Sequence, residues 1–404
     1  MSLKSYERSL DKICQNLEMS QRTAKDTEIA AYSSSSNTIP SVRNVMVIGS
    51  SGFLGPYIVS SLLRKQDVSK ILCVNRSKDG EDRTMATLKK LGYSDLADKK
   101  RLQFLVKDIT TPGLGFSNPQ FGNDATVVDA IVFNAWSPNW AMSLDKFSGL
   151  ICGVQNVINF CVSSAKPPRV IFMSSVCAVG EWPREHPEQT VIPEEVSENS
   201  ADALMHGYGK SKHKAERLLK RASNSLGLRV AIIRPGLIGG PNSPYTGGEK
   251  WPIQGWIYSI IKESIEKGYW PSHVQPVDWI PVDALADGIA TTTICQWSGK
   301  HLSVYNMVHP EPAPWSLLLE TLRDRYGLEI KEVGLPEWLA LFEAQDLKLF
   351  NFIKVMGNGR ESDFALETAN ASTMLPVISK ITVDQLDMWL EGWGLHKWIF
   401  QSKL

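Results

Sequence analysis

The stretch that decides the fold is Val45-Met-Val-Ile-Gly-Ser-Ser-Gly-Phe-Leu-Gly-Pro-Tyr57. It begins with an unbroken apolar run that is too short for a helix. Three glycines follow, at Gly49, Gly52 and Gly55, and apolar residues then resume between 58 and 63 at the spacing of one helix face. This pattern predicts a strand, a tight turn and a helix in direct succession.

Each of the three glycines has a different expected role. The first lets the chain turn sharply out of the strand, the second lets backbone N–H groups approach a pyrophosphate, and the third lets helix and strand pack closely. The anion would then lie at the N-terminus of the helix, where free N–H groups favour negative charge. A glycine-rich turn alone is equally compatible with a plain tight loop, so the rest of the chain has to decide.

The composition is that of an ordinary globular protein. The 404 residues carry 43 Lys plus Arg and 43 Asp plus Glu, so the formal net charge is zero and does not suggest a nucleic-acid partner. Six cysteines lie far apart without a C-x-x-C pair, as in reduced, buried thiols of a cytosolic protein. The seven histidines show no metal-ligand spacing, so no metal is expected.

Neither a membrane span nor an export signal is expected. No uninterrupted apolar segment approaches the roughly 18 residues that a transmembrane helix needs, and the polar N-terminus lacks a signal-peptide core. A soluble, cytoplasmic protein is therefore the expectation.

The chain organisation predicts an α/β protein with a doubly wound parallel sheet. Residues 1–40, with a serine run at 33–36, read as an extension and linker. From residue 41 to 235, short apolar segments alternate with helical patterns, which predicts a parallel sheet covered on both faces. The later strands are expected at 71–76, 102–106, 130–133, 169–173 and 229–233.

A second, smaller lobe is expected after this sheet. Beyond residue 235 the alternation breaks up, although 274–308 contains apolar segments that look like returns to the sheet. The predicted division is a nucleotide-binding domain at 41–235 and 274–308, and a mainly helical substrate lobe at 236–273 and 309–404. A cleft between the two is the expected ligand site.

The end of the second strand carries information about the dinucleotide. An acidic residue there would bind the ribose hydroxyls and select NAD, but this chain has Asn75 and Arg76, with Lys78 and Arg83 close behind. Guanidinium groups beside the ribose favour a 2′-phosphate and hence NADPH. The alternative interpretation is a solvated basic turn.

Further cofactor contacts are expected where the remaining strands end. Asp108 follows the third strand and is suited to hydrogen-bond the adenine, while Asn134 and Ala135 end the fourth strand, where small residues let the backbone approach the cofactor. The complete predicted set is Gly49, Ser51, Gly52, Phe53, Leu54, Gly55, Asn75, Arg76, Arg83, Asp108, Ile109, Asn134, Ala135, Trp136, Ser174, Tyr208, Lys212, Pro235, Gly236 and Ile238.

Three residues are predicted to be catalytic. Tyr208 and Lys212 are four residues apart, so on a helix they share one face. An ammonium near a phenol lowers its pKa, which suits Tyr208 as a proton donor to a carbonyl oxygen. Ser175 follows an apolar strand at the carboxyl end of the sheet, where its hydroxyl can stabilise an oxyanion. We prefer it to Ser174 because its spacing to Gly180 resembles the pattern of extended reductases.

Each of these features also has a plain structural interpretation. Tyr-x-x-x-Lys spacing is common in surface pairs, and a serine after a strand often only caps a turn. The argument for catalysis is their joint occurrence, in the order in which one doubly wound sheet would bring them together.

Two more features allow two interpretations each. The loop between Gly180 and Leu204, with its three glutamates, could be a substrate lid or a solvated connection. Six tryptophans could line an aromatic channel or could simply pack in cores: Trp136, Trp140, Trp182, Trp251, Trp256 and Trp270.

Together these residues resemble the extended short-chain dehydrogenase/reductase superfamily, with its G-x-x-G-x-x-G turn and Ser-Tyr-Lys triad. The closer resemblance is to the terminal thioester reductase domains of fungal adenylate-forming carboxylic acid reductases, which are similar to nonribosomal peptide synthetases. It is carried between about Val42 and Trp315 by Phe133-Asn-Ala-Trp136, Gly153-Val-Gln-Asn-Val157, Gly207-Tyr-Gly-Lys-Ser-Lys212, Ala215-Glu-Arg217, Arg234-Pro-Gly236, Trp279-Ile-Pro-Val-Asp283 and Tyr305-Asn-Met-Val-His-Pro310.

The resemblance implies a Rossmann domain and a defined reaction. Such domains take an acyl thioester on the phosphopantetheine arm of a carrier protein and reduce it with hydride from NADPH, through a hemithioacetal, to a free aldehyde that can go on to the alcohol. Carried over, Tyr208 protonates the oxygen, Ser175 hydrogen-bonds it, and Lys212 positions the cofactor and tunes Tyr208.

This chain departs from the pattern by having Phe133 where a His often precedes the Asn, and by showing no adenylation or carrier domain. The resemblance therefore leaves open a domain of a larger enzyme or a stand-alone reductase acting on a separate carrier, a free aldehyde or ketone, or another thioester. A Dieckmann-type cyclase and a non-catalytic NADPH-sensing regulator are rival interpretations, although both usually lack the Tyr-Lys pair that this chain has.

Overall fold

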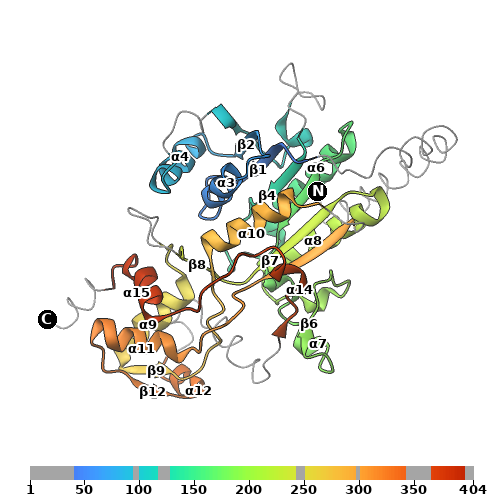
Figure 1. Cartoon of the computed structure of the whole chain (residues 1–404). Helices are drawn as coiled ribbons and strands as arrows, with labels where there is room; N and C mark the ends of the chain where they lie inside the picture. Colours follow the sequence, from blue (N-terminus) through green and yellow to red (C-terminus); the bar gives the residue numbers. More distant parts are fainter. Residues whose placement is uncertain are drawn as a thin grey trace.

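The computed structural model describes residues 41–93, 100–116, 128–242, 251–296, 301–342 and 365–395. The expected extension at 1–40 lies outside these residues. The described part contains a central parallel sheet with helices on both faces, and a second group of mostly helical elements at one end of it (Figure 1).

The sheet has seven strands in the order β11-β7-β5-β4-β1-β2-β3, and every neighbouring pair is parallel. The chain therefore winds outward from β1 in both directions, and the predicted doubly wound fold is confirmed. The strands are β1 (Asn44–Ile48), β2 (Lys70–Asn75), β3 (Leu102–Val106), β4 (Ala130–Phe133), β5 (Arg169–Met173), β7 (Val230–Pro235) and β11 (Leu302–Met307).

The unbroken apolar run of β1 is explained by burial on both faces. Val45 and Val47 belong to the core beneath α3 (Gly55–Leu63) and α10 (Val282–Ile294). Met46 and Ile48 point the other way, into the core beneath α6 (Ser148–Ser163) and α8 (Gly207–Leu226). A strand that is covered on both sides has no solvent face, so it needs no polar alternation.

The order in which strands are added to the sheet reverses at β1. The strand β2 lies on one side of β1 and β4 lies on the other. In open sheets of this kind, ligands bind outside the carboxyl ends of the strands at such a switch point. The glycine-rich turn lies directly after β1, so the fold brings it to this crevice. The next helix, α4 (Gly80–Lys90), follows β2 and borders the same edge.

The helical second lobe is built around tryptophans. Its elements are α9 (Gly255–Lys267), β9 (Tyr269–Pro271), α11 (Ser316–Tyr326), β12 (Lys331–Val333), α12 (Leu335–Leu339) and α15 (Val383–Glu391). One buried cluster holds Trp251, Trp256, Trp270, Trp279, Trp315, Trp338, Trp389 and Trp393. Trp251 and Trp270 are therefore core residues, while Trp256 belongs to this core and also lines a cleft between the lobe and the sheet.

Trp389 joins α15 to β8 (Ile238–Gly239), the short strand that comes directly after β7 in the chain. Its ring lies against Gly239 and Gly240, where an added Cβ would come within 2.7 Å and 2.3 Å of ring atoms. Its Nε1 also donates to the carbonyl oxygen of Pro241 at 2.9 Å. The two glycines thus make room for a buried indole that ties the lobe to the sheet domain.

One segment lies apart from the expected lobe range 309–404. β13 (Ala365–Leu366) pairs with β6 (Val191–Ile192), and α14 (Ala369–Ser372) packs beside β11. Ala371 also belongs to the core under the sheet. Residues 365–372 therefore pack on the nucleotide-binding domain, although they belong to the predicted lobe by sequence position.

Within the described ranges, no helix combines the length and the apolarity that crossing a membrane requires. The same residues contain no group of three or more His, Cys, Asp or Glu side chains arranged to hold a metal ion.

Candidate active site

The three glycines of the turn have three different surroundings. Gly49 has a positive φ of +88°, and an added Cβ would lie 2.9 Å from the backbone of Ala135. At Gly55 a Cβ would lie 2.4 Å from the carbonyl oxygen of Ser50, because α3 starts tightly against the turn. Gly52 is exposed and meets nothing within 4 Å.

This turn fits a dinucleotide pyrophosphate. A side chain at Gly52 would project into space that the protein leaves open, which is what a close approach of the backbone to a ligand requires. The N-cap residue of α3, Leu54, makes no side-chain cap, so the first N–H groups of the helix have no acceptor from the capping side chain and are suited to an anion.

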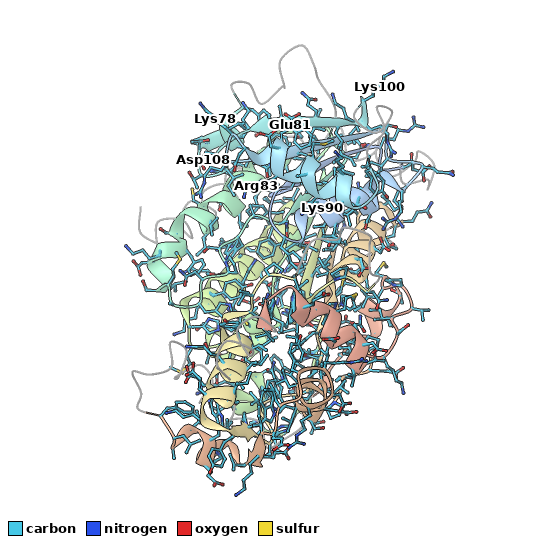
Figure 2. All side chains as sticks on the ribbon, turned by 90° about the vertical axis from the view of Figure 1, so that its left-hand side faces the viewer. Lys78, Glu81, Arg83, Lys90, Lys100 and Asp108 are labelled. Carbon is cyan, nitrogen blue, oxygen red and sulfur yellow. The ribbon has the colours of Figure 1, made fainter. Side chains whose placement is uncertain are left out.

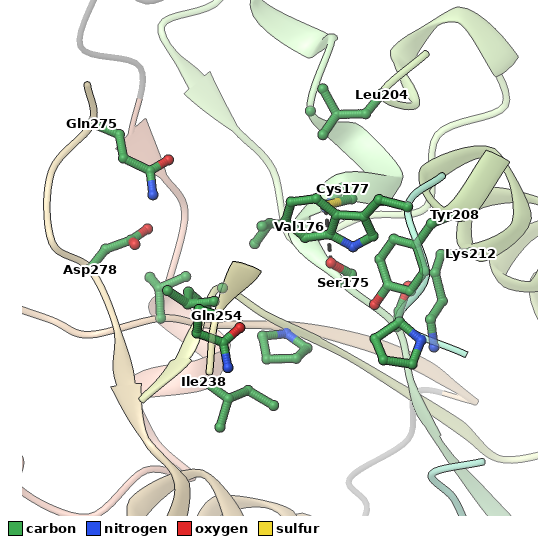
Figure 3. Close-up of a pocket in the computed structure, with 18 of the residues that line it drawn as sticks. Ser175, Val176, Cys177, Leu204, Tyr208, Lys212, Ile238, Gln254, Gln275 and Asp278 are labelled. Carbon is green, nitrogen blue, oxygen red and sulfur yellow. Dashed lines mark hydrogen bonds between the residues drawn. The ribbon is translucent and has the colours of Figure 1, made fainter. Parts of the chain in front are cut away.

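A cleft of about 960 Å³ extends from this turn to the second lobe. Its walls include all three predicted catalytic residues, Ser175, Tyr208 and Lys212, which lie together on one side (Figure 3). Of the predicted cofactor contacts, the cleft is also lined by Gly52, Phe53, Leu54, Asn134, Trp136, Ser174, Pro235, Gly236 and Ile238.

The start of α8 positions Tyr208 and Lys212. His206 caps the helix, because its Nδ1 accepts the N–H of Gly209 at 3.0 Å. Burial lowers the pKa of His206 to about 4, so at neutral pH the imidazole is uncharged and can act as this acceptor. Tyr208 then falls in the first turn and Lys212 one turn later, with both side chains on the cleft side.

The remaining predicted cofactor residues lie around the glycine turn and at the edge formed by β2, β3 and α4. Asn134 donates from Nδ2 to the carbonyl oxygen of Gly49 at 3.0 Å, which joins β4 to the turn. Figure 2 shows Lys78, Arg83 and Asp108 grouped near one end of α4, with Lys90 near its other end.

Comparison with known proteins agrees with this geometry. Residues 47–289 match the model of an NAD-binding family described as male sterility protein, and that span includes the glycine turn, Ser175, Tyr208 and Lys212. The chain belongs to this family. It is an extended short-chain dehydrogenase/reductase, a class of oxidoreductases that use a nicotinamide cofactor.

Related proteins support the resemblance seen in the sequence. The chain is 29% identical over 318 residues to a carboxylic acid reductase of Neurospora crassa, covering 75% of this chain and 29% of that protein. It is 27% identical over 399 residues to the adenylate-forming reductase Nps11 of Serpula lacrymans, covering 87% and 34% respectively. The chain thus spans about a third or less of the length of these relatives.

The fold is shared with a solved reductase. A thiolation-reductase di-domain from an archaeal nonribosomal peptide synthetase superposes with a TM-score of 0.72 at 18% identity, covering 89% of this chain and 76% of that one. The predicted resemblance to the terminal reductase domains is confirmed as a likeness of family and fold.

The three predicted catalytic residues differ in what their side chains contact. Ser175 is buried, its Oγ accepts the N–H of Cys177 at 3.2 Å, and it lies across from the Tyr208 hydroxyl (Figure 3). The neighbouring Ser174 points elsewhere and donates its hydroxyl hydrogen to Glu216. The Ser175 hydroxyl is therefore on the side of Tyr208, whereas the Ser174 hydroxyl is bonded to Glu216.

The electrostatics of Tyr208 differ from the sequence-based expectation. Burial raises the pKa of its phenol and the nearby Cys177 adds to this, while the hydrogen bond with Ser175 lowers it. Lys212 is not among the groups that shift the pKa of Tyr208. Its Nζ instead donates to the carbonyl oxygen of Met173 and lies 4.2 Å from the ring centroid of Trp136.

Asn75 also has a role different from the expected ribose contact. The side chain is 6% exposed, its Nδ2 donates to the Ser50 hydroxyl at 2.7 Å, and its Oδ1 accepts the N–H of Ser51 at 3.1 Å. Both ends of the amide therefore brace the glycine turn from below. On the exposed side of the turn, Arg83 of α4 donates from Nη2 to the hydroxyl of Ser51 at 3.1 Å.

Asp108 keeps a charged carboxylate at this edge. The N–H of Thr110 donates to its Oδ1 at 2.9 Å, and this hydrogen bond, with the nearby positive charge of Arg76, lowers the pKa of Asp108. Arg76, Arg83 and Asp108 thus provide charged groups of both signs beside the predicted adenosine end of the cofactor.

The loop from Gly180 to Leu204 is anchored at Glu194 and exposed along much of its remaining length. Glu194 is 6% exposed, and its carboxylate accepts backbone N–H groups of Asn306 and Ala371 at 2.9 Å and 3.0 Å. Glu198 lies at the surface and pairs with Lys220 at 2.8 Å. The loop is fixed at one glutamate, and its Ile192 and Leu204 line the cleft.

Sequence reasoning missed the charged groups behind the cleft. Glu216 and Arg234 form an ion pair whose side chains are both 0% exposed. The available signal was an arginine at the end of an apolar strand and a glutamate four residues after Lys212. Among the six tryptophans considered, Trp136, Trp140 and Trp256 do reach the cleft.

The contrast between Gly52 and Gly55 gives a direct test of the turn. Gly55→Ala should destabilise the fold, because its Cβ would meet backbone oxygens, whereas Gly52→Ala should leave the melting temperature unchanged and weaken dinucleotide binding. Thermal denaturation and fluorescence titration with NADPH measure the two effects. If Gly52→Ala lowers the melting temperature as much as Gly55→Ala, the open side of Gly52 is not the cofactor approach.

Proposed function

We propose that this chain is an NADPH-dependent reductase that releases an acyl group, held as a thioester on the phosphopantetheine arm of a carrier protein, as an aldehyde. The observation that carries the proposal is the convergence of Ser175, Tyr208 and Lys212 in one cleft beside the glycine turn. The names of the relatives, a carboxylic acid reductase and a thiolation-reductase di-domain, support this substrate class.

The side chains of the cleft have complementary tasks in such a reaction. The bound cofactor supplies the hydride that reaches the thioester carbon. Tyr208 gives its proton to the oxygen as negative charge develops there, and Ser175 donates a hydrogen bond to the same oxygen. When the C=O bond re-forms and the C–S bond breaks, the phenolate of Tyr208 recovers the proton and the carrier thiolate leaves.

The phenol of Tyr208 carries its proton at neutral pH, as an ordinary phenol does, so the proton is available when substrate binds. Burial raises the pKa of this phenol further, which makes Tyr208 a weaker acid in the free enzyme. Lys212, at 2% exposure, would hold the nicotinamide ribose from behind the tyrosine, with the aromatic rings of Trp136 and Phe172 at 4.2 Å and 5.0 Å beside its ammonium.

The opposite wall of the cleft favours a thioester on an amide-bearing arm over a small free carbonyl compound. Figure 3 shows Gln254, Gln275 and Asp278 across the cavity from the triad. Gln275 is 7% exposed, and no described residue forms a hydrogen bond with its side-chain amide. Gln275 lines the cleft, and the amides of a pantetheine arm offer its side chain both a donor and an acceptor.

The proton donor is tested by Tyr208→Phe. NADPH oxidation, followed by absorbance with a panel of acyl-pantetheine thioesters and aldehydes, should fall by about 10² to 10⁴ fold, the usual contribution of a positioned acid. Dinucleotide binding should persist, since the ring remains. Equal rates for the variant and the parent with the best substrate would remove Tyr208 from the mechanism, and NADPH binding without turnover of any substrate would favour a sensor.

The preference for NADPH is tested at the basic edge. Arg76→Ala and Arg83→Ala should each weaken NADPH binding by about 5- to 30-fold, the loss of one charge-assisted contact, and should change NADH binding much less. Lys90→Ala is the matched control, because Lys90 is an exposed cation near the far end of the same helix. Equal weakening of both dinucleotides would contradict a 2′-phosphate site.

The thioester arm is tested by Gln275→Leu, which keeps the approximate side-chain size. KM for an acyl-pantetheine thioester should rise by about 3- to 10-fold, the usual value of one or two hydrogen bonds, while KM for the corresponding free aldehyde should not change. Stopped-flow absorbance with the two substrates gives the comparison. An equal rise for both would indicate a general packing defect and would leave the free carbonyl compound as the better substrate class.

A further inference from the structure

Glu216 and Arg234 form a two-point ion pair that is completely enclosed. Arg234 donates from Nε to Oε1 of Glu216 at 3.0 Å and from Nη2 to Oε2 at 2.7 Å, and both side chains are 0% exposed. Removing two charges from water costs free energy. Apolar residues of similar volume often give a core that is at least as stable as one with a buried ion pair. The pair therefore calls for an explanation beyond stability.

On one side, this pair contacts the catalytic elements. Glu216 lies one turn after Lys212 on α8, and it accepts the hydroxyl hydrogen of Ser174, the residue before Ser175. Lys212 itself donates to the carbonyl oxygen of Met173, the residue before Ser174. The two charged side chains of α8 thus hold Met173 and Ser174, the two residues that precede Ser175.

On the other side, the pair contacts a wall of the cleft. Arg234 donates from Nη1 to the carbonyl oxygen of Pro193 at 3.3 Å and from Nη2 to that of Glu195 at 2.7 Å. Between these two residues, the carboxylate of Glu194 accepts N–H groups of Asn370 and Ala371 at the start of α14. We call residues 190–196 together with 365–371 the cleft strap.

The cleft strap borders the substrate space directly. Ile192 from its first part lines the cleft, as do Ala365, Leu366 and Thr368 from its second part. The two parts are also joined by the β6–β13 pairing and by the N–H of Glu194, which donates to the carboxylate of Glu367 at 2.9 Å. Hydrogen bonds therefore run from Ser174 through Glu216 and Arg234 to the carbonyl groups of Pro193 and Glu195, which flank Glu194 in this wall.

We propose that Glu216 and Arg234 are positioning residues that hold the triad and the cleft strap in one fixed relation. This inference rests on the proposed function, because it assigns their action to Lys212 and Ser175. Glu216 acts toward the reacting side and Arg234 toward the substrate wall, so the two residues should affect different kinetic constants.

The charge of Glu216 gives the proposal a measurable signature. The titratable groups around the Lys212 ammonium are Glu216 and Tyr208 from α8, and Cys177 from the turn after β5. Burial lowers the pKa of Lys212 and the Glu216 carboxylate raises it again. Without that carboxylate, Lys212 loses its proton at a lower pH, and the alkaline limb of the kcat profile should move to lower pH.

The first experiment compares Glu216→Gln with the parent enzyme in NADPH oxidation with an acyl-pantetheine thioester. We expect kcat to fall by about 10- to 100-fold, the range for a displaced catalytic group, and the alkaline limb of kcat to shift to lower pH. Glu266→Gln is the control, since Glu266 pairs with Lys262 in an exposed contact on α9 at 3.5 Å; it should leave both quantities unchanged.

The second experiment addresses the substrate wall. Arg234→Lys keeps the charge but cannot supply all of the N–H groups that hold Glu216, Pro193 and Glu195, and we expect KM for the thioester to rise about 10-fold. Glu194→Gln leaves the Glu216–Arg234 ion pair intact and replaces one acceptor oxygen by an amide NH2 group. It should raise KM in the same way without moving the pH profile.

The double variant Glu216→Leu/Arg234→Met keeps the test decisive if a single variant does not fold, because an apolar pair can replace a buried ion pair. The double variant should show the same shift of the alkaline limb of the kcat profile to lower pH as Glu216→Gln. The proposal is overturned if folded Glu216→Gln, or this double variant, keeps the parent's kcat and pH profile within twofold. Failure of the proposed function is distinct, because the parent enzyme would then show no thioester-dependent NADPH oxidation.

Discussion

The constraint on which the rest of the structure depends is the burial of β1 on both faces of a parallel sheet. Because the chain winds outward from β1 in both directions, the carboxyl ends of its neighbours converge on the turn that follows it. Asn134 after β4, Ser175 after β5 and Gly236 after β7 all reach the cleft for this reason. The topology thus assembles a site from residues that no local interaction would bring together.

Lys212 and Glu216 are charged groups that are buried away from water, which costs free energy unless the protein supplies other partners. Lys212 and Glu216 lie on the same helix behind the cleft, and each relies on backbone carbonyls, aromatic faces or a buried arginine in place of water. The lowered pKa of Lys212 and the raised pKa of Tyr208 both have burial as their main cause. The site is therefore preorganised by its surroundings, and the side chains of the proposed triad have little freedom to turn elsewhere.

Local patterns were sufficient to predict the sheet, the glycine turn and the place of the Tyr-x-x-x-Lys pair on a helix, because each depends on spacing within one segment. Contacts between distant segments were not predictable in this way. The N–H of Asn370 donates to Glu194 across 176 residues, and Asn75 turns inward to Ser50 because the turn needs its amide. The direction of a polar side chain at a strand end is decided by neighbours that a single sequence does not reveal.

The order of these segments along the chain also bears on how the protein acquires its shape during synthesis. The glycine turn and the triad are made early, whereas the stretch that pairs with β6 and holds Glu194 is made only at 365–371. The growing polypeptide therefore passes through a stage in which a nucleotide-binding sheet has its strands but lacks one flank of its cavity. At that stage Ile192 already has Val179 and Trp182 to pack against but lacks Leu366, and such partly covered apolar surface favours aggregation or capture by chaperones.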